Sequence, residues 1–381
     1  MAATPASFAA SAAEVDQALA VCPNVPAVFL IWAHTGEPYL ARTNQLRKRL
    51  LRLLGPRQHA GRMLHLRDIA VRVDYWPFRS RLESSLLLYE LARKHFPETY
   101  TKLLKLRQPA FVKLLLTNAY PRTVITTRIA GAESIHYGPF RTRAAAEKFE
   151  ADVLDLFQIR RCQEDLTPSP GHPGCVYGEM NKCLRPCQMV VSDSEYRGEV
   201  DRVAAFLRSN GETLAESVKN ARDRLSEELE FEQAQRMHKR LEKITAILQA
   251  RDELACDVTR LNGVAVLNST EREAVQLRFF DEGRWLQGAT LSLKVEEGKP
   301  ASLDRKLREI AASLARPGRL TLRERQEHIA ILAAWYYASW RDGEWVPYEN
   351  LSALPYRKLV NAVHRVAKSE TGWPCGAAVR S

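Results

Sequence analysis

The sequence predicts a multidomain protein of the α/β (α+β) class, on three observations. The chain has 381 residues, more than one typical domain, and 45% of them are hydrophobic. Its hydrophobic pattern is strand-like near residue 27, helical in several long stretches and strand-like again after residue 257. A segment rich in cysteine, proline and glycine interrupts these patterns. We therefore expect a small mixed sheet with helices, a Cys-rich connecting segment, an antiparallel helical hairpin and a C-terminal α+β segment.

These changes of pattern predict five parts of the chain. They are an N-terminal extension (1–22), a sheet-and-helix domain (23–105), a connecting segment (106–200), a helical hairpin (210–252) and a C-terminal region (257–381). The net charge of +11 favours a polyanionic partner such as nucleic acid. The N-terminal segment has no basic leader, and no apolar run is long enough to span a bilayer, so we expect a cytoplasmic protein that does not enter a membrane.

Four cysteines lie close together in the connecting segment: Cys162, Cys175, Cys183 and Cys187. Intervals of 12, 7 and 3 residues, rich in proline and glycine, allow the four thiols to converge without a large core. This spacing is typical of a metal or iron–sulfur site. Zinc is the alternative, although the paired C-x₂₋₄-C arrangement occurs only once, and two disulfides are a further alternative.

The N-terminal domain begins with a predicted hairpin. Ala27 to Trp32 and Tyr39 to Ala41 are rich in strand formers and are separated by a Gly-Pro turn. Leucines at helical spacing follow, with Asn44 as the expected N-cap. At 100° per residue, Arg49 lies at the border of the leucine stripe and can fold over the sheet edge, whereas its basic neighbours point to solvent.

Several short segments, in order, resemble the UvrC family of nucleotide-excision-repair incision subunits. The hairpin with the basic helix resembles the GIY-YIG nuclease domain of that family. Residues 120–122, 127–128, 137–140 and 157–162 are similar to its connecting segment, and the four cysteines lie where the family carries an iron–sulfur cluster. The resemblance implies a [4Fe–4S] cluster, DNA repair within the SOS response, and DNA as a partner. The basic residues expected to contact DNA are Arg42, Arg47, Lys48, Arg49, Arg122 and Arg128.

The nuclease motif departs from the family pattern at catalytic positions. Tyr39 and Arg49 match the family's tyrosine and arginine, but Phe29 replaces the first tyrosine and Ala41 the motif glycine. The glutamate that would hold Mg²⁺ falls on Leu88, and leucine cannot bind this hard cation. The resemblance therefore implies a domain that has lost hydrolysis. A register shift would leave the ligand role to Glu83 or Glu90 and preserve an active, metal-dependent endonuclease.

The predicted hairpin is similar to the UVR motif, through which UvrC-type proteins bind UvrB. The residues expected to bind such a partner are Leu229, Phe231, Glu232, Ala234, Met237 and Leu241. His238 and Lys239 replace an Arg-Asp pair of that motif. The alternative is an ordinary hairpin packed in the protein's own core.

The C-terminal region reads as a three-stranded meander between residues 264 and 295, followed by three helices. It is weakly similar to the family's partial RNase H-like region, and the resemblance implies that a second nuclease centre and a helix-hairpin-helix module are missing. Three functions follow in order of preference: a noncatalytic excision-repair protein that binds DNA and a UvrB-like protein, an active endonuclease, and an iron–sulfur sensor.

Overall fold

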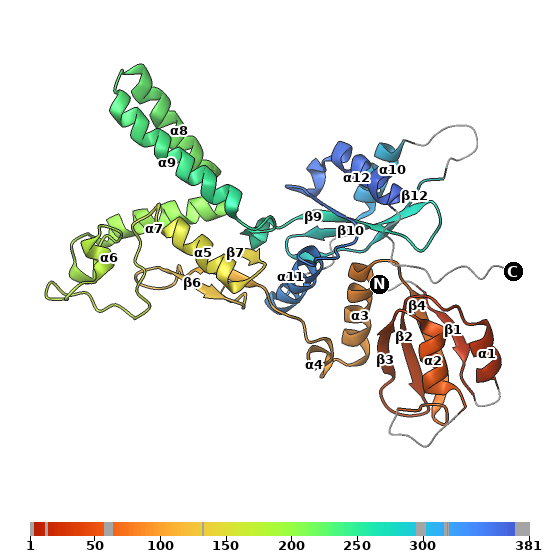
Figure 1. The fold of residues 1–381 in the computed structure, drawn as a ribbon. Helices are drawn as coiled ribbons and strands as arrows, with labels where there is room; N and C mark the ends of the chain where they lie inside the picture. Colours follow the sequence, from red (N-terminus) through yellow and green to blue (C-terminus); the bar gives the residue numbers. More distant parts are fainter. Residues whose placement is uncertain are drawn as a thin grey trace.

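The computed structural model describes residues 4–11, 14–56, 64–131, 133–294, 302–315, 318 and 320–369. They form three antiparallel sheets with helices around them, and one long helical hairpin projects from the body (Figure 1). This arrangement confirms the predicted multidomain α+β class. No helix in these ranges is both long enough and apolar enough to cross a bilayer.

The N-terminal sheet has the strand order β1-β4-β2-β3. The predicted hairpin is present, because β2 pairs with β3 from Ala27↔Thr43 to Ile31↔Tyr39. The bounds are β1 Ala6–Ala9, β2 Ala27–Ala33, β3 Tyr39–Thr43 and β4 Ala70–Pro77. Because β1 pairs with β4, the expected N-terminal extension contributes an edge strand to this sheet.

Two helices, α1 (Val15–Val21) and α2 (Leu46–Leu54), cover one face of this sheet. The expected N-cap at Asn44 is wrong: Gln45 precedes the helix and makes no side-chain cap bond. The side chain of Thr43 accepts a hydrogen bond from the Gln45 amide at 3.2 Å, so the strand end, not Asn44, holds this turn.

The other face of the N-terminal sheet joins the C-terminal region. Helix α3 (Arg81–His95) is capped by Ser80, whose side chain accepts from the Leu82 amide. Together with α4 (Tyr100–Leu104), it shares one hydrophobic core with α11 (Leu322–Tyr336). Figure 1 shows α3 beside α11. The N-terminal domain is therefore docked on the C-terminal region through a continuous apolar contact.

The middle sheet has the order β6-β5-β7-β8 and belongs to the connecting segment except for its last strand. The bounds are β5 Ala110–Leu114, β6 Thr123–Thr126, β7 Ile135–Phe140, β8 Cys256–Asp257, α5 Arg143–Leu154, α6 Val176–Glu179, η1 Pro186–Gln188 and α7 Asp193–Arg208. Ser192 begins α7 with a capping box, as its Ser-x-x-Glu pattern predicts.

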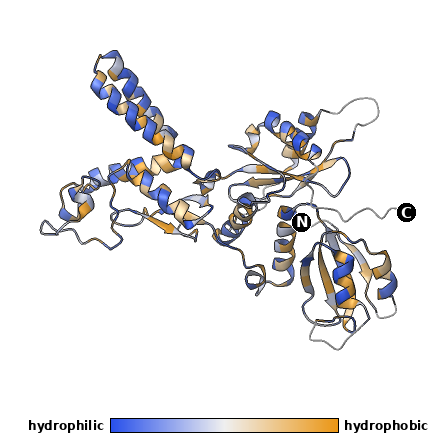
Figure 2. Cartoon of the chain, viewed as in Figure 1, coloured by the Kyte–Doolittle hydropathy of each residue, from blue (hydrophilic) through white to orange (hydrophobic). Residues whose placement is uncertain are grey.

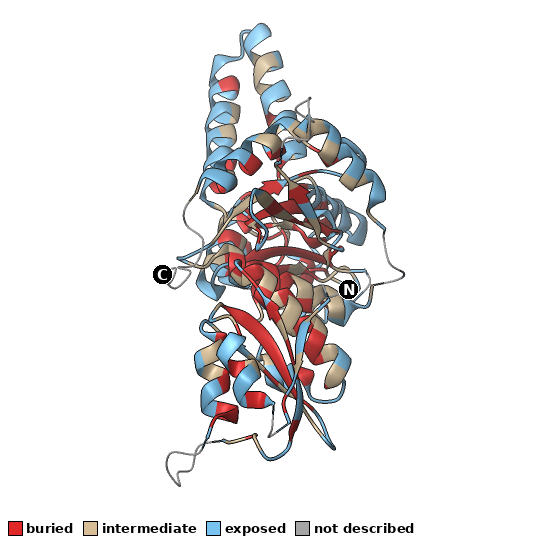
Figure 3. Cartoon of the chain, turned by 90° about the vertical axis from the view of Figure 1, so that its right-hand side faces the viewer, coloured by how far each residue is buried: buried red, intermediate tan, exposed pale blue. Residues whose placement is uncertain are grey.

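The hairpin consists of α8 (Glu212–Glu227) and α9 (Phe231–Ala250), as predicted. Figure 3 shows that most of its surface is exposed and that its buried residues concentrate toward the body. Its base packs on the core of the middle sheet through Val218, Ile244 and Ile247.

The C-terminal sheet has the order β11-β10-β9-β13, and β12 also pairs with β10. The expected third strand of the meander is divided into β11 and β12, while β13 adds an edge strand that was not expected. The bounds are β9 Gly263–Asn268, β10 Ala274–Asp281, β11 Arg284–Trp285, β12 Ala289–Ser292, η2 Val258–Arg260, α10 Leu303–Ser313, β13 Glu344–Pro347, η3 Leu351–Ala353 and α12 Tyr356–Lys368. Residues 295–301 and 370–381, which the predicted region includes, lie outside the described residues.

Candidate functional site: a nuclease-like pair, a thiol cluster and an exposed hairpin tip

Tyr39 and Arg49 meet at the edge strand of the N-terminal sheet. Arg49 Nη2 donates a hydrogen bond to the Tyr39 hydroxyl at 3.0 Å, as expected for an arginine at the border of the leucine stripe. The ring of Phe29 lies 6.1 Å from that of Tyr39 and is fully buried. The site therefore offers one phenol and one guanidinium, while Phe29 contributes only apolar surface.

Leu88 lies on the other side of this sheet. Phe29 and Tyr39 pack with α1 and α2, whereas Leu88 packs into the core that α3 shares with the C-terminal region. The structure thus does not bring position 88 to the Tyr39–Arg49 pair.

The two alternative carboxylates also point away from the pair. Glu83 forms an ion pair with Arg278 of β10 at 3.3 Å, and burial raises the pKa of the Glu83 carboxyl. Glu90 lines a cavity between α3 and the C-terminal region, together with Trp285 and His328. Neither glutamate supplies an acidic ligand beside Tyr39 and Arg49.

The basic residues near α2 differ in how freely they can contact a ligand. Lys48 is exposed, and Arg42 is exposed while donating to the Ser84 hydroxyl at 3.0 Å. Burial of the guanidinium and then the charge of Arg81 lower the pKa of Arg42. The expectation that Arg47 points to solvent is wrong, because its Nε donates to the Cys22 carbonyl and the side chain is half-buried.

The two basic candidates of the middle sheet also differ. Arg128 is exposed at the end of β6. Arg122 is half-buried and donates to the Gln163 side chain at 3.0 Å, one residue beyond Cys162. Arg128 is therefore the more accessible cation for a polyanion.

The four cysteines occupy one loop region between α5 and α7. None forms a disulfide; Cys183 and Cys187 are buried, Cys162 is half-buried and Cys175 is exposed. Burial above all, and also the neighbouring thiols Cys175, Cys162 and Cys187, raise the pKa of the Cys183 thiol to about 11. The backbone closes this loop through the Ser169 amide, which donates to the Cys187 carbonyl at 2.9 Å.

The donor chemistry of this thiol cluster suits a thiophilic metal or an iron–sulfur cluster, because the four thiols are free and influence one another electrostatically. In the described ranges, however, no three His, Cys, Asp or Glu side chains are arranged as a closed metal site. The four cysteines therefore fit such a group in their donor chemistry and in lying within one loop region.

Arg160 is a functional candidate that the sequence pattern did not reveal. Its side chain is 1% exposed; Nη1 donates to Cys162 Sγ at 3.4 Å and to the Glu164 carbonyl at 2.6 Å. Its Nε donates to the Tyr120 carbonyl, while Nη2 is buried without a partner. Arg160 thus places a buried guanidinium directly beside the Cys162 sulfur.

The hairpin residues divide into an exposed tip and a packed interior. Leu229 and Phe231, at the turn between α8 and α9, are 71% and 64% exposed, and Glu232 is exposed beside them. Ala234 is buried, and Met237 and Leu241 pack against the core of the middle sheet. Of these six residues, the exposed ones that can contact a partner directly are Leu229, Phe231 and Glu232. Figure 2 shows that hydrophilic residues cover most of the hairpin surface, so its apolar tip stands out.

The middle part of the chain is similar to a known excinuclease domain. Residues 111–206 match the family model for the UvrC/Cho excinuclease middle domain. The chain is 25% identical to UvrABC system protein C of Lachnospira eligens, over 76% of this chain and 48% of the relative. The protein of the same name from Moorella thermoacetica is also 25% identical, over 84% of this chain and 53% of the relative.

The corresponding protein of Desulfatibacillum aliphaticivorans is 26% identical over 71% of this chain and 45% of its own length. The chain thus spans about half the length of the curated relatives that it matches. No solved structure matches it. The chain is thus similar to UvrC proteins over most of its own length, and residues 111–206 are similar to their middle domain.

Proposed function

We propose that the chain acts in nucleotide excision repair, where it binds DNA and a UvrB-like protein without cutting DNA itself. The observation that carries the proposal is the Tyr39–Arg49 pair, which keeps a phosphate-binding guanidinium but is paired with no carboxylate among the described residues. Metal-assisted hydrolysis needs a hard oxygen ligand to hold Mg²⁺ and a group that activates water. Phe29 and Leu88 provide neither.

Arg49 and the nearby cations retain a surface for the DNA backbone. Arg49 fixes the Tyr39 hydroxyl, and exposed Lys48 extends positive charge along α2. Arg42 lies on the opposite face of the edge strand, where it donates to Ser84 of α3. Contacts of cations with the DNA backbone carry affinity without reading base sequence.

Nuclease assays on damaged duplex with Mg²⁺ or Mn²⁺ test the loss of hydrolysis. We expect no incision by the wild-type protein. Incision that disappears in Arg49→Ala but persists in Arg52→Ala, an exposed arginine on the same helix, would establish the alternative of an active endonuclease.

The hairpin tip is the proposed contact for a UvrB-like protein. Exposed Leu229 and Phe231 present apolar surface next to Glu232, an arrangement suited to a partner helix with an apolar stripe and a basic rim. Phe231→Asp should abolish co-purification with UvrB. Val21→Asp, which changes an 81% exposed valine elsewhere, is the control and should leave co-purification intact. Retained binding by Phe231→Asp would reject the assignment.

The thiol cluster is proposed to hold a [4Fe–4S] cluster through Cys162, Cys175, Cys183 and Cys187, with zinc as the alternative. When bound, such a group would supply a rigid cross-link between the loop segments. Iron content and visible absorption of anaerobically purified protein distinguish the two metals. Cys183→Ser should lower metal content and the melting temperature, whereas Cys22→Ser, a buried thiol outside the cluster, should leave the metal content unchanged. An unchanged melting curve and DNA affinity in Cys183→Ser would reject a structural role.

A further inference from the structure

Helix α12 has two faces of opposite character. Its apolar face packs on the C-terminal sheet through four buried residues, Leu359, Ala362, Val363 and Val366. Figure 1 places α12 on the side of this sheet away from α11, next to α10. The outward face is therefore a surface of the molecule.

Every charged residue of α12 is basic. Its exposed positions include Arg357, Lys358, His364, Arg365 and Lys368, and the helix contains no aspartate or glutamate. Arg365 is neutralised by Glu344, which accepts two hydrogen bonds at 2.6 Å. The remaining lysines and arginine form no ion pair with the described residues, so the face carries an uncompensated positive charge.

The placement of two of these cations does not help the helix. Arg357 and Lys358 lie in the first turn, where the helix dipole disfavours positive charge by a few tenths of a kcal/mol or more. Glu212 in α8 and Glu324 in α11 lie in the corresponding turn, whereas α2 and α5, like α12, begin without an acidic residue. Folding stability alone does not account for this arrangement.

The neighbouring helix shows what an ordinary solvated face looks like in this protein. On α10, Arg305 pairs with Glu309 and Arg308 with Asp304, each at 2.8 Å. These i,i+4 pairs cancel the charge of the face. The charged face of α10 is therefore an ordinary solvated surface, whereas the face of α12 can attract an anion.

We propose that the outward face of α12 binds the phosphate backbone of duplex DNA as a second contact area, apart from the one at α2. Charge complementarity identifies the occupant, because a row of cations without acidic neighbours matches a regularly charged polyanion. The inference rests on the proposed DNA binding and adds a contact surface to it.

The test measures how the affinity for a fluorescently labelled duplex depends on KCl concentration. Each phosphate contact contributes about 0.9 to the slope of log affinity against log salt. The double variant Arg357→Gln/Lys358→Gln should therefore flatten the slope by about 2 and weaken binding at low salt. The control Arg143→Gln/Arg305→Gln removes two exposed arginines that are paired with Glu147 and Glu309, and should change the slope little.

The outcomes separate the two proposals. Absence of salt-dependent DNA binding by the wild-type protein would remove the proposed function itself. Salt-dependent binding with the same slope in the α12 variant would overturn only the present inference. An equal effect in the control would also overturn it, since lost net charge would then suffice. If the α12 variant instead loses UvrB and keeps its DNA slope, the surface binds an acidic protein and not DNA.

Discussion

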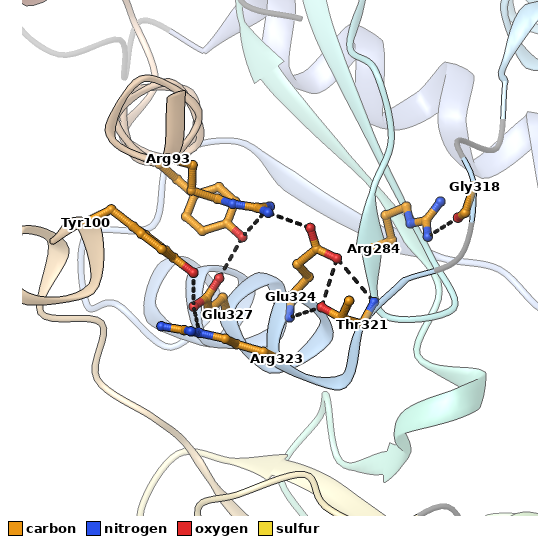
Figure 4. Close-up of polar contacts among 9 residues, drawn as sticks. Arg93, Tyr100, Arg284, Gly318, Thr321, Arg323, Glu324 and Glu327 are labelled. Atoms are coloured by element: carbon orange, nitrogen blue, oxygen red, sulfur yellow. Dashed lines mark hydrogen bonds and ion pairs between the residues drawn. The ribbon is translucent and has the colours of Figure 1, made fainter. Parts of the chain in front are cut away.

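Glu327 should be one of the residues on which the docking of the N-terminal domain depends most. The side chain is buried in α11 and accepts hydrogen bonds from the hydroxyls of Tyr89 and Tyr100, at 2.8 and 3.0 Å (Figure 4). These tyrosines come from α3 and α4, so one carboxylate connects both helices to the C-terminal region. Burial, followed by the Glu327 side chain, raises the pKa of both tyrosines and keeps them protonated as donors.

Replacing Glu327 with alanine leaves the hydroxyl protons of Tyr89 and Tyr100 without an acceptor, although the Tyr89 oxygen still accepts a hydrogen bond from Arg93 at 3.2 Å. A hydrogen bond to a charged group contributes about 1.5–3 kcal/mol, and the contact with the exposed Arg323 adds little. The expected loss in the free energy of unfolding is therefore roughly 3–5 kcal/mol. Urea unfolding monitored by tryptophan fluorescence suits this region, because Trp285 and Trp335 lie in the same core.

A double-mutant cycle isolates the contribution of the hydrogen bonds. Tyr89→Phe and Tyr100→Phe remove the donors, so in their presence Glu327→Ala should cost much less than in the wild-type background. Glu309→Ala, which breaks an exposed ion pair on α10, is the control and should cost under about 0.5 kcal/mol. A Glu327→Ala loss no larger than that of the control would refute the argument.

Three further changes test other parts of the structure. Arg160→Met should lower the metal content, and Arg160→Lys should restore part of it. Arg161→Gln, which breaks an ion pair with Asp155, should leave the metal content unchanged. Equal metal content in all three variants would exclude a role for Arg160. Burial, then the charge of Lys113, lowers the pKa of His136 to about 4. Between about pH 6.5 and 4 the unfolded chain therefore binds a proton that the folded chain does not, and the free energy of unfolding should fall by roughly 3 kcal/mol as the pH is lowered through this window. His136→Gln should flatten this pH profile, and an unchanged profile would exclude the role of His136. Leu88→Glu should lower the free energy of unfolding by about 1–3 kcal/mol and should restore no nuclease activity. Incision by this variant would show that position 88 does reach Tyr39.

Local signals in the sequence predicted much of the fold. The Gly-Pro turn and β-rich flanks located the β2–β3 hairpin, Ser192 with Glu195 located the start of α7, and two apolar stripes located α8 and α9. Each signal acts between residues close in the chain, where turn geometry, capping and helical periodicity decide the outcome. Helical periodicity likewise predicted that Arg49 lies at the border of the leucine stripe, where it can fold over the sheet edge.

Contacts between distant segments could not be predicted in this way. Pairing of β1 with β4, and of Glu327 with two tyrosines more than 200 residues earlier, depends on tertiary packing that leaves no periodic pattern. The hairpin residues show a similar limit. Periodicity indicates that Ala234 and Phe231 belong to one helix, but only the turn at Leu229, with its positive φ of 61°, places Phe231 outside the packed stripe.

The apolar side chain of Leu88 is part of the hydrophobic core through which α3 docks on the C-terminal region. An α3 helix that holds a metal must present a solvated carboxylate, whereas an α3 helix that joins two domains must bury its faces in apolar surroundings. Leu88 packs into the core that includes Trp335 and Ile331 of α11, where an unpaired carboxylate would lose hydration without a compensating partner. The apolar side chain at position 88 therefore suits the interdomain core and is consistent with the proposed loss of hydrolysis. The same helix keeps Glu83 only by pairing it with Arg278, so its remaining buried charge also serves the contact between domains.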